Sequence, residues 1–166
     1  FFLDPGHMAP MLYSQLCLAG KFTLDELAQL RQWGSPTTGH PEFEIARGIE
    51  NTSGPLGQGH VFAIGAAIAA KFLASHTGNP TFSKETIYAY ISDGGVQEEI
   101  SQGGARIASV LGLDNLIMFY DSNDIQLSTE TKDVMNEDTA AKYRALGWEV
   151  IEINGNDVEQ IRSAIE

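Results

Sequence analysis

The sequence predicts an α/β domain in which a parallel sheet carries helices on both faces. Two short apolar runs, 87–91 and 116–120, consist mostly of β-branched and aromatic residues, which is typical of buried strands. Helical patterns alternate with these runs along the chain, and this alternation indicates a parallel sheet. The 166 residues show no internal repeat and no interdomain linker, so they suit one domain with a sizeable core.

The N-terminal third predicts two helices and then a long loop. A helix is expected over 12–20, ending at a glycine. Thr23-Leu24-Asp25-Glu26 has the form of a capping box, so a second helix is expected to begin there. Residues 34–56 are rich in Gly, Pro, Ser and Thr and predict a loop. A loop of that length inside a compact domain is usually functional.

The longest apolar stretch, 61–74, predicts a helix that is buried on several sides. It is shorter than the roughly 20 residues that a bilayer requires. Small residues in this stretch would allow another helix to approach closely: Gly65, Ala66, Ala69 and Ala70. A central helix of a monomer fits this pattern.

The remaining elements complete the alternation. A glycine turn at Gly94-Gly95 is expected to open a helix over 96–111. Its predicted apolar stripe consists of Val96, Ile100, Ile107, Ala108 and Leu111. Further along, the patterns predict a helix over 138–146, a strand over 149–153 and a capped helix over 157–165.

Oxygen-bearing side chains follow both predicted central strands. Asp93 ends the first and Asn123 follows the second, 30 positions later, which is about the length of one βαβ unit. Parallel strands finish on the same edge of the sheet, where α/β sheets bind ligands. Carboxylate and amide oxygens suit Mg²⁺ beside a phosphate, and a glycine turn before a helix suits an anion. The pattern therefore predicts a metal-bridged diphosphate, although Asp and Asn also end strands without any such role.

Composition narrows the classes of partner. The net charge of −12 argues against nucleic acid and anionic membranes, because phosphate backbones recruit basic surfaces. A diphosphate remains compatible, since a cation and backbone N–H groups can neutralise it. The single cysteine, Cys17, excludes an internal disulfide and suits a reducing compartment. With no signal-peptide or lipidation pattern, a cytoplasmic protein is expected.

Several segments resemble a known family. Ser92-Asp93-Gly94 followed by Asn123 resembles the thiamine diphosphate motif, a Gly-Asp-Gly triplet with a downstream Asn. Residues 38–42 resemble the TPGHPE segment of transketolase, and residues 52–59 resemble its TTGPLGQG segment. Pro5-Gly6-His7 and residues 146–150 match two shorter pieces of that family. The resemblance implies a PP-type thiamine diphosphate-binding fold, with 1–166 as one partial diphosphate-binding domain.

The resemblance also implies a metal and diphosphate site. Asp93, Asn123 and the backbone carbonyl of Ile125 would hold Mg²⁺ or Ca²⁺. Gly94, Gly95 and Asn123 would contact the diphosphate of the cofactor. In this family the thiazolium carbon stabilises a carbanion, while the protein supplies position and electrostatics.

Further roles are implied for the thiamine ring and the substrate. Gly54, Pro55 and Leu56 would pass close to the ring, and His7 would lie against the cofactor. His40 would stand near the reacting carbon of a sugar phosphate, and both histidines would be catalytic, since imidazole suits proton transfer near neutral pH. The implied reaction moves a two-carbon ketol unit between sugar phosphates in the pentose phosphate pathway. His60 and His76 have no such support and are expected to be structural.

The chain departs from the family pattern at several positions. Ser92 replaces the first glycine of the triplet, and His7 is followed by Met8-Ala9-Pro10. Glu99 stands where glycine is usual and Gly103 where a second glutamate is usual, so acidic residues that join the two active sites of a homodimer are altered.

The resemblance covers only part of a transketolase. The glutamate that activates the cofactor is absent, because it lies in a pyrimidine-binding domain of a partner subunit. The chain is thus expected to be a fragment or one component of a split enzyme. Two alternatives remain open: a related enzyme such as dihydroxyacetone synthase, and a non-catalytic scaffold or assembly subunit.

Overall fold

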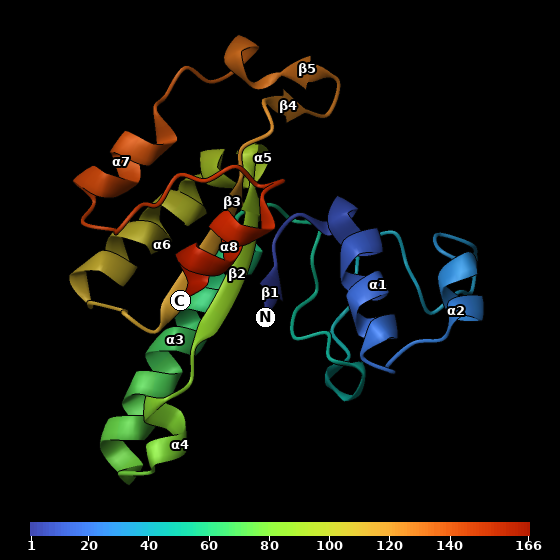
Figure 1. The fold of residues 1–166 in the computed structure, drawn as a ribbon, viewed down its shortest axis with the longest axis horizontal. Coiled ribbons are helices and arrows are strands. Elements are labelled where there is room, and N and C mark those ends of the chain that lie inside the picture. Colours follow the sequence, from blue (N-terminus) through green and yellow to red (C-terminus); the bar gives the residue numbers. More distant parts are fainter.

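The computed structural model describes all residues from 1 to 166 and contains the predicted parallel sheet (Figure 1). Its three strands are β1 (Phe2–Leu3), β2 (Ile87–Ser92) and β3 (Leu116–Asp121), in the order β1-β2-β3 with parallel pairing throughout. A separate antiparallel hairpin follows, made of β4 (Ile125–Gln126) and β5 (Thr129–Glu130). Both predicted central strands are therefore confirmed.

Helices occupy most of the remaining chain. In order they are η1 (Gly6–Met8), α1 (Ala9–Leu18), α2 (Leu24–Ala28), η2 (Ile45–Arg47), α3 (Gln58–Thr77), α4 (Pro80–Ser83), α5 (Asp93–Gln97), α6 (Glu99–Val110), η3 (Thr131–Asp133), α7 (Thr139–Ala145) and α8 (Val158–Ile165). None of them combines the length and the apolar character that a bilayer crossing requires.

The main core lies between the sheet and α3. Ala63, Ile64 and Ala67 of this helix pack against buried residues of β2 and β3, with Ala108 of α6 beside them. Alternate residues of a strand face opposite sides of a sheet. A second core therefore forms on the other face, where Leu3 packs with Leu12 and Tyr13 of α1. Tyr88, Tyr90 and Phe119 stack on that face and are half-buried.

The capping box at the start of α2 is present. The backbone N–H of Thr23 donates to Glu26 Oε2 at 2.8 Å, and the N–H of Glu26 donates to Thr23 Oγ1 at 3.2 Å. The first predicted helix begins three residues earlier than expected, at Ala9, because Pro10 is accepted in its first turn.

Helix α3 is longer than the predicted 61–74, and it is buried along one side only. Its buried residues are Gly59, His60, Ala63, Ile64, Ala67 and Ala70. Phe62 and Phe72 are 46% and 63% exposed, and a side chain at Gly65 would meet no atom within 4 Å. The expectation of burial on several sides is wrong for this chain, because no element covers the opposite side.

The predicted helix over 96–111 is two helices, and the predicted turn at Gly94-Gly95 is wrong, since both glycines lie within the first helix, α5. Glu98 has an extended backbone, with φ −64° and ψ 132°, and separates α5 from α6. The predicted apolar stripe is partly wrong, since Ile100, Ile107 and Leu111 are each about half exposed. Small residues instead face α3: a side chain at Gly104 would lie 2.8 Å from Ile64. Close packing of the two helices selects small residues there.

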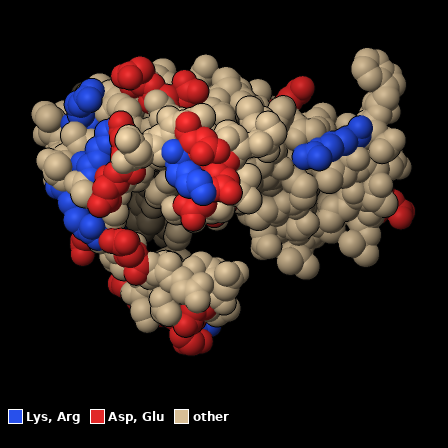
Figure 2. All heavy atoms as spheres, turned by 90° about the horizontal axis from the view of Figure 1, so that it is seen from above, with Lys and Arg blue, Asp and Glu red and all other residues tan.

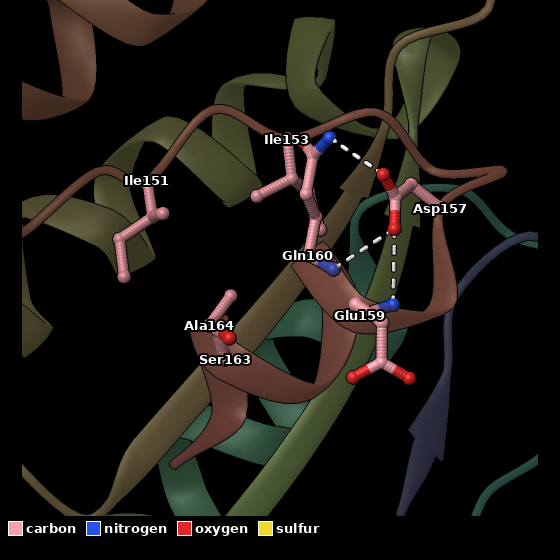
Figure 3. A pocket seen from close by; sticks show the side chains of 7 residues that line it. All are labelled: Ile151, Ile153, Asp157, Glu159, Gln160, Ser163 and Ala164. Carbon is pink, nitrogen blue, oxygen red and sulfur yellow. Dashed lines mark hydrogen bonds between the residues drawn. The ribbon is translucent and has the colours of Figure 1, made fainter.

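The predicted strand over 149–153 is absent. No backbone N–H in this segment donates to another backbone group, and the side chains of Ile151 and Ile153 are exposed. Figure 3 shows these two isoleucines facing α8 across a hollow of about 360 Å³. Asp157 caps α8, as predicted, by accepting from the N–H groups of Glu159 and Gln160. The segment has strand-forming residues but does not pair with the edge strand β3.

Candidate cofactor site

Three polar side chains follow the three strands at one edge of the sheet. Asp4 follows β1, Asp93 follows β2, and Asn123 lies two residues beyond β3. The strands are parallel and Ser92 pairs with Asp121, so β2 and β3 end side by side. Figure 1 shows this edge beside α5 and the β4–β5 hairpin. Such an edge is where open α/β sheets bind ligands.

Asp93 is buried and already oriented by two hydroxyl groups. Tyr120 donates to its Oδ1, and Thr131 Oγ1 donates to its Oδ2 at 3.0 Å. Burial, followed by the hydrogen bond to Asp93, raises the pKa of Tyr120 to about 12, so this phenol stays a donor at neutral pH. A carboxylate oxygen has further lone pairs, so Asp93 can still ligate a cation.

Asn123 lies in an exposed turn before the hairpin. Its Oδ1 accepts from the backbone N–H of Ile125 at 3.1 Å, and its Nδ2 donates to Asp121 Oδ2 at 3.1 Å. These bonds fix the orientation of the amide and leave Oδ1 a second lone pair. The neighbouring Asp124 has φ +62°, in the left-handed region that Asp tolerates better than most residues.

The loop bearing Gly54, Pro55 and Leu56 lies against the turn at the end of β2. A side chain added at Gly94 would come within 3.0 Å of Leu56 Cδ1. Gly54 has φ +127°, a conformation that favours glycine. The structure therefore brings together two of the predicted glycine segments, and a side chain at Gly94 would require that of Leu56 to shift.

His40 stands beside this loop. A side chain at Gly54 would lie 3.4 Å from His40 Cγ, and one at Gly6 would lie 2.4 Å from His40 Cδ2. His7 is exposed in η1, next to Gly6, and its carbonyl accepts a long bond from Arg31 at 3.5 Å. The imidazole of His40 thus lies beside both Gly6 and Gly54, and His40, like His7, is exposed.

Three functional candidates escaped the sequence reasoning: Asp4, Tyr120 and Thr131. Asp4 gave the same signal as Asp93, an acidic residue after an apolar strand, but β1 has only two residues. Tyr120 reads as an ordinary strand aromatic. Thr131 reaches Asp93 from a 3-10 turn 38 positions away, and nothing in the local sequence predicts that contact.

Most basic side chains near the site are paired with acidic ones. Figure 2 looks onto the molecule from above, and most basic side chains on this face lie next to acidic ones. Ion pairs of the C-terminal half include Lys132–Glu130, Lys142–Glu137 and Arg144–Glu152. A bound diphosphate would therefore depend mainly on backbone N–H groups and a metal ion for neutralisation.

The donor set fits a magnesium-bound diphosphate. No group of three His, Cys, Asp or Glu side chains could hold a metal by itself. Asp93, Asn123 and the carbonyl of Ile125 would supply three oxygen ligands and would leave positions for phosphate oxygens, which is the usual arrangement for Mg²⁺. The hollow in Figure 3 is lined by none of these residues and lies at α8.

A strand-end carboxylate, a downstream amide and a glycine-lined loop together define a diphosphate-binding α/β domain. Comparison with known proteins makes the class specific: the model of the transketolase thiamine diphosphate binding domain matches residues 1–166. The chain belongs to the transketolase family.

Individual relatives are similar to this chain over nearly its whole length. It is similar to the transketolase of Staphylococcus epidermidis, with 44% identity over 99% of this chain and 25% of that protein. Among solved structures, the transketolase of Campylobacter jejuni superposes with a TM-score of 0.93 at 39% identity, covering 99% of this chain and 26% of that one. Transketolase of Pichia stipitis in complex with sedoheptulose-7-phosphate gives 0.92 at 38% identity, over 99% and 25%. The chain thus spans about a quarter of the length of these relatives.

Proposed function

We propose that residues 1–166 supply the metal- and diphosphate-binding part of a transketolase, which transfers a two-carbon ketol unit between sugar phosphates in the pentose phosphate pathway. The family match over the whole chain carries this proposal. It is supported by the meeting of Asp93, the Gly94 turn and the Gly54–Leu56 loop at one sheet edge.

Each predicted residue has a role in this proposal. Asp93, Asn123 and the carbonyl of Ile125 hold Mg²⁺, with Ca²⁺ as a substitute of the same ligand preference. Backbone N–H groups at Gly94 and Gly95 face the diphosphate. When bound, thiamine diphosphate supplies a carbon that stabilises the carbanion of the ketol unit.

In this proposal, His40, His7 and the Gly54–Leu56 loop contact the thiamine ring and the substrate. Gly54, Pro55 and Leu56 lie along the ring and exclude water from it. His40 and His7 bind sugar hydroxyls and move protons at them, for which imidazole is suited near neutral pH. Sugar phosphate is the proposed substrate class, and the complex of the Pichia stipitis relative with sedoheptulose-7-phosphate supports it.

A partner surface completes the proposal. Exposed apolar side chains on α3 and α6 are Phe62, Ile68, Phe72, Ile100, Ile107 and Val110, and the exposed Leu111 directly follows α6. Contiguous exposed apolar area often marks an interface. We propose that these helices meet a second subunit, in a homodimer or with a pyrimidine-binding domain. A cytoplasmic location, as expected from the lone Cys17, is part of the same proposal.

The test is ketol transfer by the complete protein containing residues 1–166. With Mg²⁺ and thiamine diphosphate, it should transfer a two-carbon unit from sedoheptulose-7-phosphate to an aldose phosphate, measured by chromatography of the products. Residues 1–166 alone should not catalyse the transfer and should gain it when a pyrimidine-binding domain is added. Absence of transfer by the complete, cofactor-loaded protein would refute the proposed reaction.

A further inference from the structure

Asp4 connects three segments of the candidate site. Its backbone N–H continues the sheet by donating to the carbonyl of Tyr90 at 3.0 Å. Its Oδ1 accepts from the N–H of Gly59, in the first turn of α3, at 2.8 Å. Its Oδ2 faces the turn after β2, since a side chain at Gly95 would lie 2.4 Å from that oxygen. One carboxyl group therefore lies against the end of β1, the start of α3 and the Gly94-Gly95 turn of helix α5.

The packing around Asp4 leaves no room for displacement. The residue is fully buried, and a side chain at Gly59 would lie 2.6 Å from its Cα. Gly57, which ends the Gly54–Leu56 loop, has φ +82° and directly precedes the first turn of α3. The hydrogen bond between Asp4 and the first turn of α3 therefore also fixes the point at which the Gly54–Leu56 loop enters the helix.

The burial of the Asp4 carboxyl group lowers the stability of the fold. Burial raises the pKa of the Asp4 carboxyl. The backbone N–H groups of Gly57, Gly59 and His60 act against this rise without cancelling it. Oδ2 has no hydrogen-bond partner in the protein. A buried oxygen without a partner costs stability, so a role in positioning gives a physical reason for the group.

We propose that Asp4 is a positioning residue, whose carboxyl group sets the distance between the Gly54–Leu56 loop and the Gly94-Gly95 turn and thereby shapes the cradle for the cofactor. This inference rests on the proposed cofactor site and deepens it. The side chain of Asp4 has no hydrogen bond to Asp93, Asn123, His7 or His40, so it acts through the backbone of α3 and α5.

The test compares two substitutions at Asp4 in the complete protein. Asp4→Ala removes the acceptor for the Gly59 N–H, and thiamine diphosphate affinity in saturating Mg²⁺ should fall about tenfold or more by calorimetry. Asp4→Asn keeps an acceptor oxygen of the same shape, so it should restore affinity to within about threefold of the original protein. Hydrogen exchange without cofactor should show faster exchange of the Gly59 and His60 amides in Asp4→Ala alone.

Asn115→Ala is the matched control. The Asn115 side chain donates to the carbonyl of Ala67 at 3.1 Å and ties the same helix to the opposite end of the sheet. It should lower the melting temperature without weakening cofactor binding. Equal losses of affinity in Asp4→Ala and Asn115→Ala, or none in Asp4→Ala, would overturn the positioning role. If the unmodified protein fails to bind thiamine diphosphate, the proposed function fails first, and the role of Asp4 with it.

Discussion

Thr131 donates a hydrogen bond to Oδ2 of Asp93 at 3.0 Å, although 38 positions separate the two residues. The contact links the 3-10 turn after the β4–β5 hairpin to the end of β2. Partners that orient a metal ligand are nearly as important for metal affinity as the ligand itself. The hydrogen bond from Thr131 therefore holds the β4–β5 hairpin next to Asp93, which is proposed to bind the metal ion together with Asn123.

Thr131→Val is expected to weaken Mg²⁺ binding in the presence of thiamine diphosphate about tenfold, because Asp93 loses one orienting donor while the shape of the side chain is kept. Calorimetric titration of Mg²⁺ measures the change. Thr129→Val is the control, since its hydroxyl donates to Asp133 on the exposed side of the same hairpin. An affinity unchanged in Thr131→Val, or lowered equally in both variants, would contradict this role.

His60 should make stability depend on pH. Burial lowers its pKa to about 4, and its Nδ1 lies 2.7 Å from Ser101 Oγ. The folded state therefore holds His60 neutral, whereas an unfolded histidine binds a proton near pH 6.5. The stabilising contribution is complete above pH 6.5 and is lost as the pH falls toward 4. It amounts to about 2 to 3 kcal/mol between pH 7 and 4.5.

Denaturant unfolding at pH 7 and pH 4.5 measures this contribution. In His60→Gln the loss of unfolding free energy between the two pH values should be smaller by about that amount. His76→Gln, at an exposed histidine stacked on Phe72, should behave like the original protein. The same pH dependence in all three proteins would show that His60 is not the group responsible.

Sequence reasoning succeeded where residues carry a local signal. The short apolar runs of mostly β-branched and aromatic residues predicted β2 and β3, and the Thr23–Glu26 capping box was found because all its atoms lie within four residues. The positions of Asp93 and Asn123 at the same edge of the sheet were predicted from the parallel strands that precede them.

Predictions from the sequence were wrong or missing where contacts between distant segments determine the structure. The hydrogen bond from Thr131 to Asp93 spans 38 positions and has no local signature. Residues 149–153 have strand-forming side chains but pair with no neighbour, since pairing depends on the edge of β3. The exposed isoleucines of α6 were expected inside, because periodicity shows that a helix has an apolar face without showing what covers it.

Ile107→Glu should weaken subunit association. Ile107 is 52% exposed on α6, and a charge placed there would have to be desolvated if this face meets a partner. Sedimentation analysis of the complete protein should show more of the dissociated species, with the melting temperature of the separate subunit unchanged.

Leu18→Glu provides the comparison for association. Leu18 is 83% exposed at the end of α1, a helix that Figure 1 shows apart from α3 and α6. It should leave the association unchanged. Equal behaviour of the two variants would exclude the α6 face as the interface.

Calorimetry of thiamine diphosphate binding with and without Mg²⁺ tests most directly whether Asp93 holds the metal ion. Asp93→Ala should abolish Mg²⁺-dependent binding. Asp93→Asn keeps the shape of the side chain and an acceptor for only one of Tyr120 and Thr131, and should weaken binding strongly in a folded protein. Asp114→Ala, at the opposite end of the sheet and paired with Lys71, should bind normally. Unchanged affinity in a folded Asp93→Ala variant would contradict the account.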